Sequence, residues 1–140
     1  MKTIIIAQLF VLFTFLGCQS NVITKINNYN EGDFIMALKS DNKGLVESSI
    51  FQVVYHHVIG MEIITPKIIL ELELLKQNGS TERIKKISNI AMNFFNKFDS
   101  SLQAEVKCNF YSRGKLFEVI ENVLTERKMN ANNNHITIEK

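Results

Sequence analysis

The sequence predicts an all-α fold of about six helices, paired as three helical hairpins. Apolar residues recur at three- and four-residue spacing through residues 32–129, which is the pattern of helices that bury one face. Polar turns with helix start and stop signals separate these stretches. Two runs favour extended chain, Ile63-Ile64 and Ile136-Thr137-Ile138, but each is too short and isolated to build a sheet. A short helical solenoid and a plain helical bundle both fit this pattern.

The first two predicted helices are separated by a polar turn. The first covers residues 33–39 and ends at Ser40-Asp41-Asn42, just before Gly44. The second runs from about Leu45 to Val58 and ends at Gly60. The apolar spacing of the second helix predicts a core-facing stripe made of Val46, Ile50, Val53 and His57.

The third predicted helix has the strongest start signal. Thr65 can cap free backbone N–H groups, and Pro66 lacks the N–H that would have no partner at the first helical position. Gly79 is expected to end the helix as a left-handed residue. The predicted apolar face contains Ile68, Leu72 and Leu75, broadened by Ile69, Leu70 and Leu74.

The last three predicted helices begin at polar signals of the same kind. Ser80-Thr81-Glu82 opens the fourth helix and places an acid in the first turn, where the helix dipole favours it. Ser100 and Gln103 have the spacing of a capping box for the fifth helix, and Ser112-Arg113-Gly114 precedes the sixth. The three core stripes contain, in order, Ile84, Ile87, Ala91, Phe94 and Phe98; Leu102 and Val106; Leu116, Phe117, Ile120, Val123 and Leu124.

Equivalent positions repeat along the predicted domain. Val46 and Ser49 align with Ile84 and Ile87 at an offset of 38, and a third copy begins roughly 33 residues later, around Leu116. Residues 37–50 resemble a HEAT-type repeat, in which a leucine ends one helix and a hydrophobic residue opens the next after an Asp/Asn turn. Glu47 and Lys85 stand where that family usually has arginine. The HEAT-like resemblance implies stacked hairpins with a long surface for partners.

Residues 1–17 predict a secretory signal peptide. Lys2 supplies the positive start, and residues 4–16 form an apolar run with Gln8 as its one strongly polar member. A membrane-spanning helix needs about 20 apolar residues, so a permanent span is disfavoured.

The end of this segment, Phe15-Leu16-Gly17-Cys18, resembles the lipobox of bacterial lipoproteins. The resemblance implies cleavage before Cys18, a diacylglycerol thioether on its sulfur, and acyl chains that hold the protein stably on a membrane. Gln19 and Ser20 lack the aspartate that marks inner-membrane retention in this family, so the resemblance favours the outer membrane of the cell envelope. Whether the periplasmic or the surface face is used stays open. The alternative is a plain cleaved signal with a chance cysteine at its end.

The flanks of the predicted domain are polar and rich in asparagine. Residues 18–31 are therefore expected to form a lipidated flexible tether, and residues 130–140 a loose carboxy-terminal tail. Cys108 is the other cysteine, so no intrachain disulfide can form once Cys18 carries lipid. Its apolar neighbours predict a buried thiol, and a reactive thiol or an intermolecular disulfide is the alternative.

The charge pattern disfavours nucleic acid as a partner. The chain has 16 basic and 14 acidic residues and no run of five like charges. Lys85-Lys86 and Arg127-Lys128 are expected to be solvated helix faces.

No catalytic, cofactor-binding or metal-binding residue is predicted. His56 and His57 would point about 100° apart on a helix and cannot face one ion together. Glu118 and Glu121 could share a face, but their polar neighbours indicate a solvated surface and not a desolvated catalytic pair. The sequence has no nucleophile elbow, phosphate-binding glycine loop or dinucleotide fingerprint. Phe51 and Tyr55 lie off the core stripe and are candidates for contact with a partner.

The sequence thus predicts a non-enzymatic, lipid-anchored helical module that binds or scaffolds another protein of the cell envelope. One alternative is an immunity or inhibitor lipoprotein that acts against a toxin or lytic enzyme. Near-neutral charge lends it no support, because such a protein ought to carry a patch complementary to its target. The other alternative is an envelope enzyme of unknown type. The identity of the partner and the oligomeric state stay open.

Overall fold

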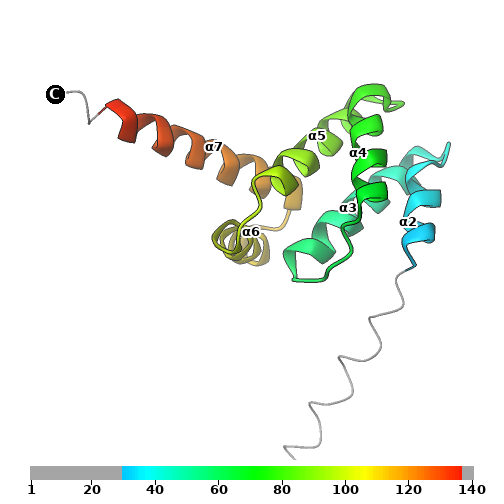
Figure 1. Ribbon diagram of the computed structural model, residues 1–140, viewed down its shortest axis with the longest axis horizontal. Coiled ribbons are helices and arrows are strands. Elements are labelled where there is room, and N and C mark those ends of the chain that lie inside the picture. Colours follow the sequence, from blue (N-terminus) through cyan, green and yellow to red (C-terminus); the bar gives the residue numbers. More distant parts are fainter. Residues whose placement is uncertain (1–29, 137–140) are drawn as a thin grey trace, which may run out of the picture. The chain divides into compact units, whose positions relative to one another are not determined.

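The computed structural model describes residues 30–136, so the predicted signal peptide, Cys18 and nearly all of the predicted tether lie outside the described residues. Six helices follow one another in the described part (Figure 1). They are α2 (Glu31–Leu38), α3 (Lys43–Val58), α4 (Pro66–Asn78), α5 (Glu82–Asn96), α6 (Ser100–Arg113) and α7 (Leu116–Ile136). No strand occurs between residues 30 and 136, so the all-α prediction is confirmed, and Ile63-Ile64 lies in irregular chain.

Side-chain caps start four of these helices. Asn42 accepts hydrogen bonds from the backbone N–H groups of Gly44 and Leu45, as expected for a residue that precedes a helix. Thr65 and Thr81 cap α4 and α5 in the predicted positions. The capping box at Ser100 is wrong, because Asp99 caps α6 and accepts from the Leu102 N–H at 2.6 Å.

Gly79 ends α4 for a reason other than the predicted one. Its φ is −54°, so the expectation of a left-handed residue is wrong. A Cβ at this position would lie 2.5 Å from the Leu75 carbonyl oxygen and 2.8 Å from a methyl group of Ile84, where α4 turns into α5. Positive φ values occur instead at Gly60, after α3, and at Gly114, after α6.

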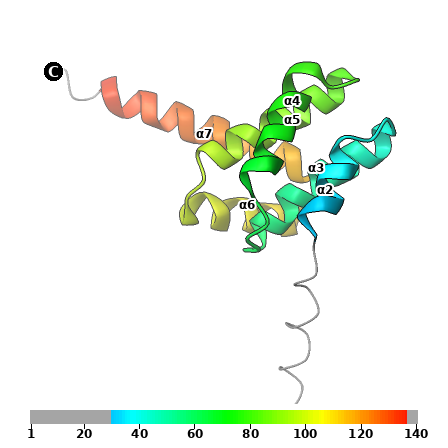
Figure 2. The ribbon, with the colours of Figure 1, turned by 45° about the vertical axis from the view of Figure 1, so that its right-hand side comes forward.

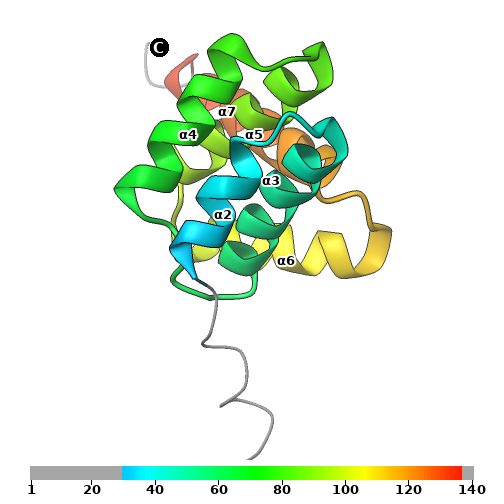
Figure 3. The same ribbon diagram turned by 90° about the vertical axis from the view of Figure 1, so that its right-hand side faces the viewer.

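The first two hairpins stack with equivalent helices side by side. The start of α2 is joined to the start of α4 because Thr65 donates a hydrogen bond to Glu31, and Lys39 near the end of α2 pairs with Glu71 at 2.9 Å. An ion pair of 2.8 Å between Glu47 and Arg83 joins the starts of α3 and α5. Figure 3 shows α2 and α4 in front, with α3 and α5 behind them.

The third hairpin departs from this order. The first turns of α7 lie along α5, where Lys86 and Glu121 pair at 3.0 Å, so the second helices of all three hairpins are neighbours in series. In contrast, α6 packs on α7 and against the end of α3 (Figure 2). Gln103 of α6 donates a hydrogen bond of 3.0 Å to the His57 carbonyl. The first two hairpins are therefore stacked, and the third packs in a different order.

Buried positions of α3 and α5 are related by the 38-residue offset found in the sequence. Val46 and Ile84, which the sequence aligned, are both buried. The same offset relates buried Val53 to Ala91 and buried His56 to Phe94. The larger apolar members, Val46, Val53, Ile84 and Phe94, each contribute about 1.5–3 kcal/mol when they are buried.

The prediction that Cys108 is buried is wrong. Cys108 is exposed, because it follows Val106 by two positions and so lies about 200° around α6 from that buried side chain. His57 is partly buried, as a core or boundary histidine, and its neighbour His56 is the more buried of the two, with 4% of its surface exposed.

Helix α7 continues through Ile136 and so includes the first residues of the predicted carboxy-terminal tail, 130–136. Residues 116–136 contain neither glycine nor proline, and a helix that is already nucleated extends at little cost. From Lys128 to Asn132 the side chains are exposed. None of the described helices is both long and apolar enough to cross a membrane.

Candidate functional site

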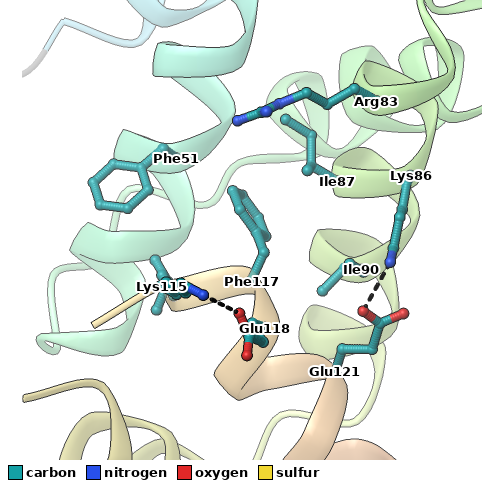
Figure 4. A pocket seen from close by; sticks show the side chains of 10 residues that line it. Phe51, Arg83, Lys86, Ile87, Ile90, Lys115, Phe117, Glu118 and Glu121 are labelled. Carbon is teal, nitrogen blue, oxygen red and sulfur yellow. Dashed lines mark ion pairs between the residues drawn. The ribbon is translucent and has the colours of Figure 1, made fainter. Parts of the chain in front are cut away.

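An open groove of about 720 Å³ lies between α3, α5 and the first turns of α7 (Figure 4). Its lining is apolar at the centre and charged at the edge. The apolar residues are Phe51, Ile87, Ile90, Leu116 and Phe117, and the charged ones are Arg83, Lys86, Lys115, Glu118 and Glu121.

Two half-buried phenylalanines carry the aromatic character of the groove. Phe51 of α3 and Phe117 of α7 meet edge to face, with ring centroids 6.4 Å apart. Phe51 also stacks on Tyr55 one turn along α3, and Tyr55 meets Phe110 of α6, each at 5.9 Å. A continuous row of half-buried rings therefore runs from α7 across α3 to α6.

Phe51 is half-exposed because it follows Ile50, which is fully buried, and the next helical position is rotated by about 100°. The structure thus places both sequence candidates, Phe51 and Tyr55, in one aromatic surface. Phe117 packs against the core, as expected, and its exposed part lines the groove beside buried Leu116.

Three ion pairs frame the groove. Arg83 pairs with Glu47 at 2.8 Å, Lys86 with Glu121 at 3.0 Å, and Lys115 with Glu118 at 3.2 Å. In every pair the basic side chain is the more exposed partner, at 77%, 61% and 77% against 28%, 47% and 60% for the acids. The three pairs balance in charge, and the basic member of each extends further into solvent.

Glu118 and Glu121 do share the face that their spacing suggested, and both line the groove. Glu118 forms an ion pair with Lys115, and Glu121 forms one with Lys86 (dashed lines in Figure 4). This arrangement differs from a catalytic carboxylate pair, in which one acid is desolvated beside the other. Lys86 is exposed, as expected for a solvated helix face, and its ion pair also joins α5 to α7.

The backbone before α7 positions the last basic residue. Lys115 has a φ of 51°, a left-handed conformation that is uncommon for a residue with a side chain. It follows Gly114, which has a φ of 69°. This sharp entry turns Leu116 into the core and leaves the Lys115 side chain at the edge of the groove.

The adjacent histidines lie in different aromatic clusters. His56 packs against Phe34 and Tyr55, with centroids 6.1 and 5.8 Å away. His57 lies among Phe94, Phe95 and Phe98, with the nearest ring centroid at 4.1 Å. Burial lowers the pKa of each imidazole below the usual 6.5, so both are neutral at pH 7. Among the described residues, no three His, Cys, Asp or Glu side chains come together as metal ligands.

A cluster of polar side chains outside the groove holds α7 against α6. Arg127 donates hydrogen bonds to Glu105 at 2.9 Å and to Ser101 at 2.9 Å, and it pairs with Asp99 at 3.3 Å. The Leu102 backbone N–H, and then Arg127, hold the pKa of Asp99 below its usual value. Arg127 was expected on a solvated face, but the contacts give it a structural role.

No known protein-family model, curated protein or solved structure matches the chain significantly. The chemistry of the groove therefore rests on its own residues. Sequence patterns pointed to Phe51, whereas Arg83 and Lys115 carried no signal, because ordinary surface residues have the same composition and spacing.

Proposed function

We propose that this chain is a lipid-anchored bacterial envelope protein whose helical domain is a non-enzymatic module that binds another protein. The observation that carries the binding role is the groove, in which half-buried Phe51 and Phe117 lie inside a frame of ion pairs. Protein interfaces commonly have this composition, with aromatic residues at the centre and a polar rim.

The location in this proposal rests on the sequence. Cys18 follows an apolar leader and would carry the lipid, with the outer membrane favoured. An anchor of two or more acyl chains is effectively stable, and it raises the local concentration of the domain near membrane partners. A weak groove contact would then suffice for binding in the envelope.

Replacement of the anchor cysteine tests the location. Cys18→Ser should release the protein from isolated membranes and abolish incorporation of labelled fatty acid, because the thioether can no longer form. Cys108→Ser is the matched control and should leave both readouts unchanged. Labelling that persists in Cys18→Ser would refute the lipid anchor.

Affinity capture of the membrane-anchored protein tests the binding role. We expect a reproducible envelope partner that is lost from the double variant Phe51→Ala, Phe117→Ala. The control is Leu70→Ala, Leu74→Ala, which removes two exposed leucines of α4 that lie outside the groove lining. If a toxin or lytic enzyme is captured, the protein is an inhibitor. If no protein is captured reproducibly, the proposal of a binding module fails.

A further inference from the structure

We infer that the groove receives an acidic amphipathic α-helix of the partner protein, with apolar side chains on Phe51 and Phe117 and carboxylates directed to Arg83, Lys86 and Lys115. This inference rests on the proposed function and adds the chemistry of the partner segment. Three properties of the groove support it: its walls are helices, its floor is aromatic, and the basic side chains at its rim are more exposed than their acidic partners.

The walls of the groove favour a helix over an extended segment. They are formed by α3, α5 and α7, whose backbone N–H and C=O groups are bonded within each helix. No strand edge exists in residues 30–136 to which an extended peptide could add. An extended peptide would bury unpaired backbone groups against the apolar floor, whereas a helix satisfies its own.

The floor of the groove favours large apolar anchors. Phe51 and Phe117 lie on two different helices and leave part of each ring exposed, and Ile87 and Ile90 line the α5 side (Figure 4). Helices that bind in grooves place apolar anchors at positions three, four and seven residues apart, so that several side chains enter together.

The rim of the groove favours an acidic segment. A segment that approaches from solvent meets the basic member of each ion pair first, because Arg83, Lys86 and Lys115 are more exposed than their carboxylate partners. The exposed neighbours Ser48 and Gln52 on α3 and Asn89 on α5 are uncharged, so the basic members of these pairs are the groups that a carboxylate of the segment would contact. Rim charges act mainly on the rate of association and on the choice of partner.

Photo-crosslinking in cells that express the full chain tests the inference. A benzophenone amino acid replaces Phe51 in one variant and Leu70 on α4 in the control variant. We expect Phe51 to crosslink to a partner peptide that carries acidic residues and apolar residues at helical spacing, and Leu70 not to crosslink to it. Crosslinks from Phe51 to a basic segment, to lipid, to a second copy of this chain, or to no molecule would overturn the inference.

Two variants that change the rim charge complete the test. Arg83→Gln with Lys86→Gln should lower the yield of the Phe51 crosslink about three- to tenfold, since each rim contact contributes modestly. Lys107→Gln with Lys128→Gln removes the same charge from exposed positions on α6 and α7 and should leave the yield unchanged. Circular dichroism confirms that both pairs fold. Equal yields in the two pairs would refute the charge argument.

The outcomes also separate this inference from the proposed function. If a partner protein is captured but crosslinks only from Leu70, the groove is not its site, and the binding module stands. If no partner is captured and neither position crosslinks to protein, both proposals fail.

Discussion

At the scale of single residues, small positions decide how closely helices approach. Gly79 lies where α4 turns into α5. Its φ of −54° suits any residue, so the position requires glycine because there is no room for a Cβ, and not because of its backbone conformation. Gly44, in the first turn of α3, has no such constraint, since an added Cβ would lie 3.4 Å from the Asn42 side-chain oxygen. The two glycines are therefore expected to respond in opposite directions to the same substitution.

We predict that Gly79→Ala lowers the free energy of unfolding by about 1–3 kcal/mol, because the new Cβ forces the backbone of α4 and Ile84 apart. Gly44→Ala should raise it by about 0.5 kcal/mol, since alanine favours the helix. Urea denaturation followed by circular dichroism measures both. A Gly79→Ala protein as stable as the wild type would show that the turn relaxes without cost.

At the scale of helices, caps determine where each helix begins, and polar contacts between helices determine how much of its length is held against a neighbouring helix. Asp99 shows both roles, since it caps α6 through the Leu102 N–H and pairs with Arg127 of α7. Arg127 is also the last residue of α7 with a contact to α6 in the described hydrogen bonds and ion pairs, and the next side chains along α7 are exposed.

We predict that Arg127→Ala loosens the last turns of α7. The variant loses charge-assisted hydrogen bonds to Glu105 and Ser101, and at these partly exposed positions the loss should cost about 1 kcal/mol. Hydrogen exchange of the amides after residue 127 measures the effect, and Lys128→Ala is the neighbouring control. Unchanged exchange in Arg127→Ala would show that helix propensity alone maintains the end of α7.

At the scale of the whole domain, α3 is the element that unites the hairpins. It packs on α2, α5 and α6, and its last turn contributes His57 to a cluster with Phe94 and Phe98. Phe94 is fully buried and lies where α3 and α5 meet. Because this single core is shared, the domain is expected to unfold in one transition.

We predict that Phe94→Ala lowers the free energy of unfolding by about 3–5 kcal/mol through loss of apolar contact and the cavity left behind. That is a large share of the stability of an ordinary domain. Phe51→Ala, at a half-buried ring in the groove, should cost clearly less. Urea unfolding with far-UV circular dichroism measures both variants. Two separate transitions in the wild-type protein would contradict a single shared core.

Sequence periodicity by itself determined the all-α class, the six helices and most core positions, because these depend on local spacing and on capping residues such as Thr65 and Thr81. The same reasoning failed where neighbouring positions compete for one partner. Asp99 caps α6 in place of Ser100, the next residue along the chain. Aspartate and serine are both favoured as helix caps, so residue type alone did not decide which of the two takes the position.

The groove was a product of tertiary structure alone. Arg83 and Lys86 come from α5 and Lys115 from the turn before α7, and only the packing of α7 along α5 places them around Phe51 and Phe117. The departure of α6 from the stacked order likewise arises from its contacts with His57 and Tyr55 on α3. Helix formation follows from residues that are near in sequence, whereas a binding surface depends on which distant residues become neighbours, and local patterns do not contain that information.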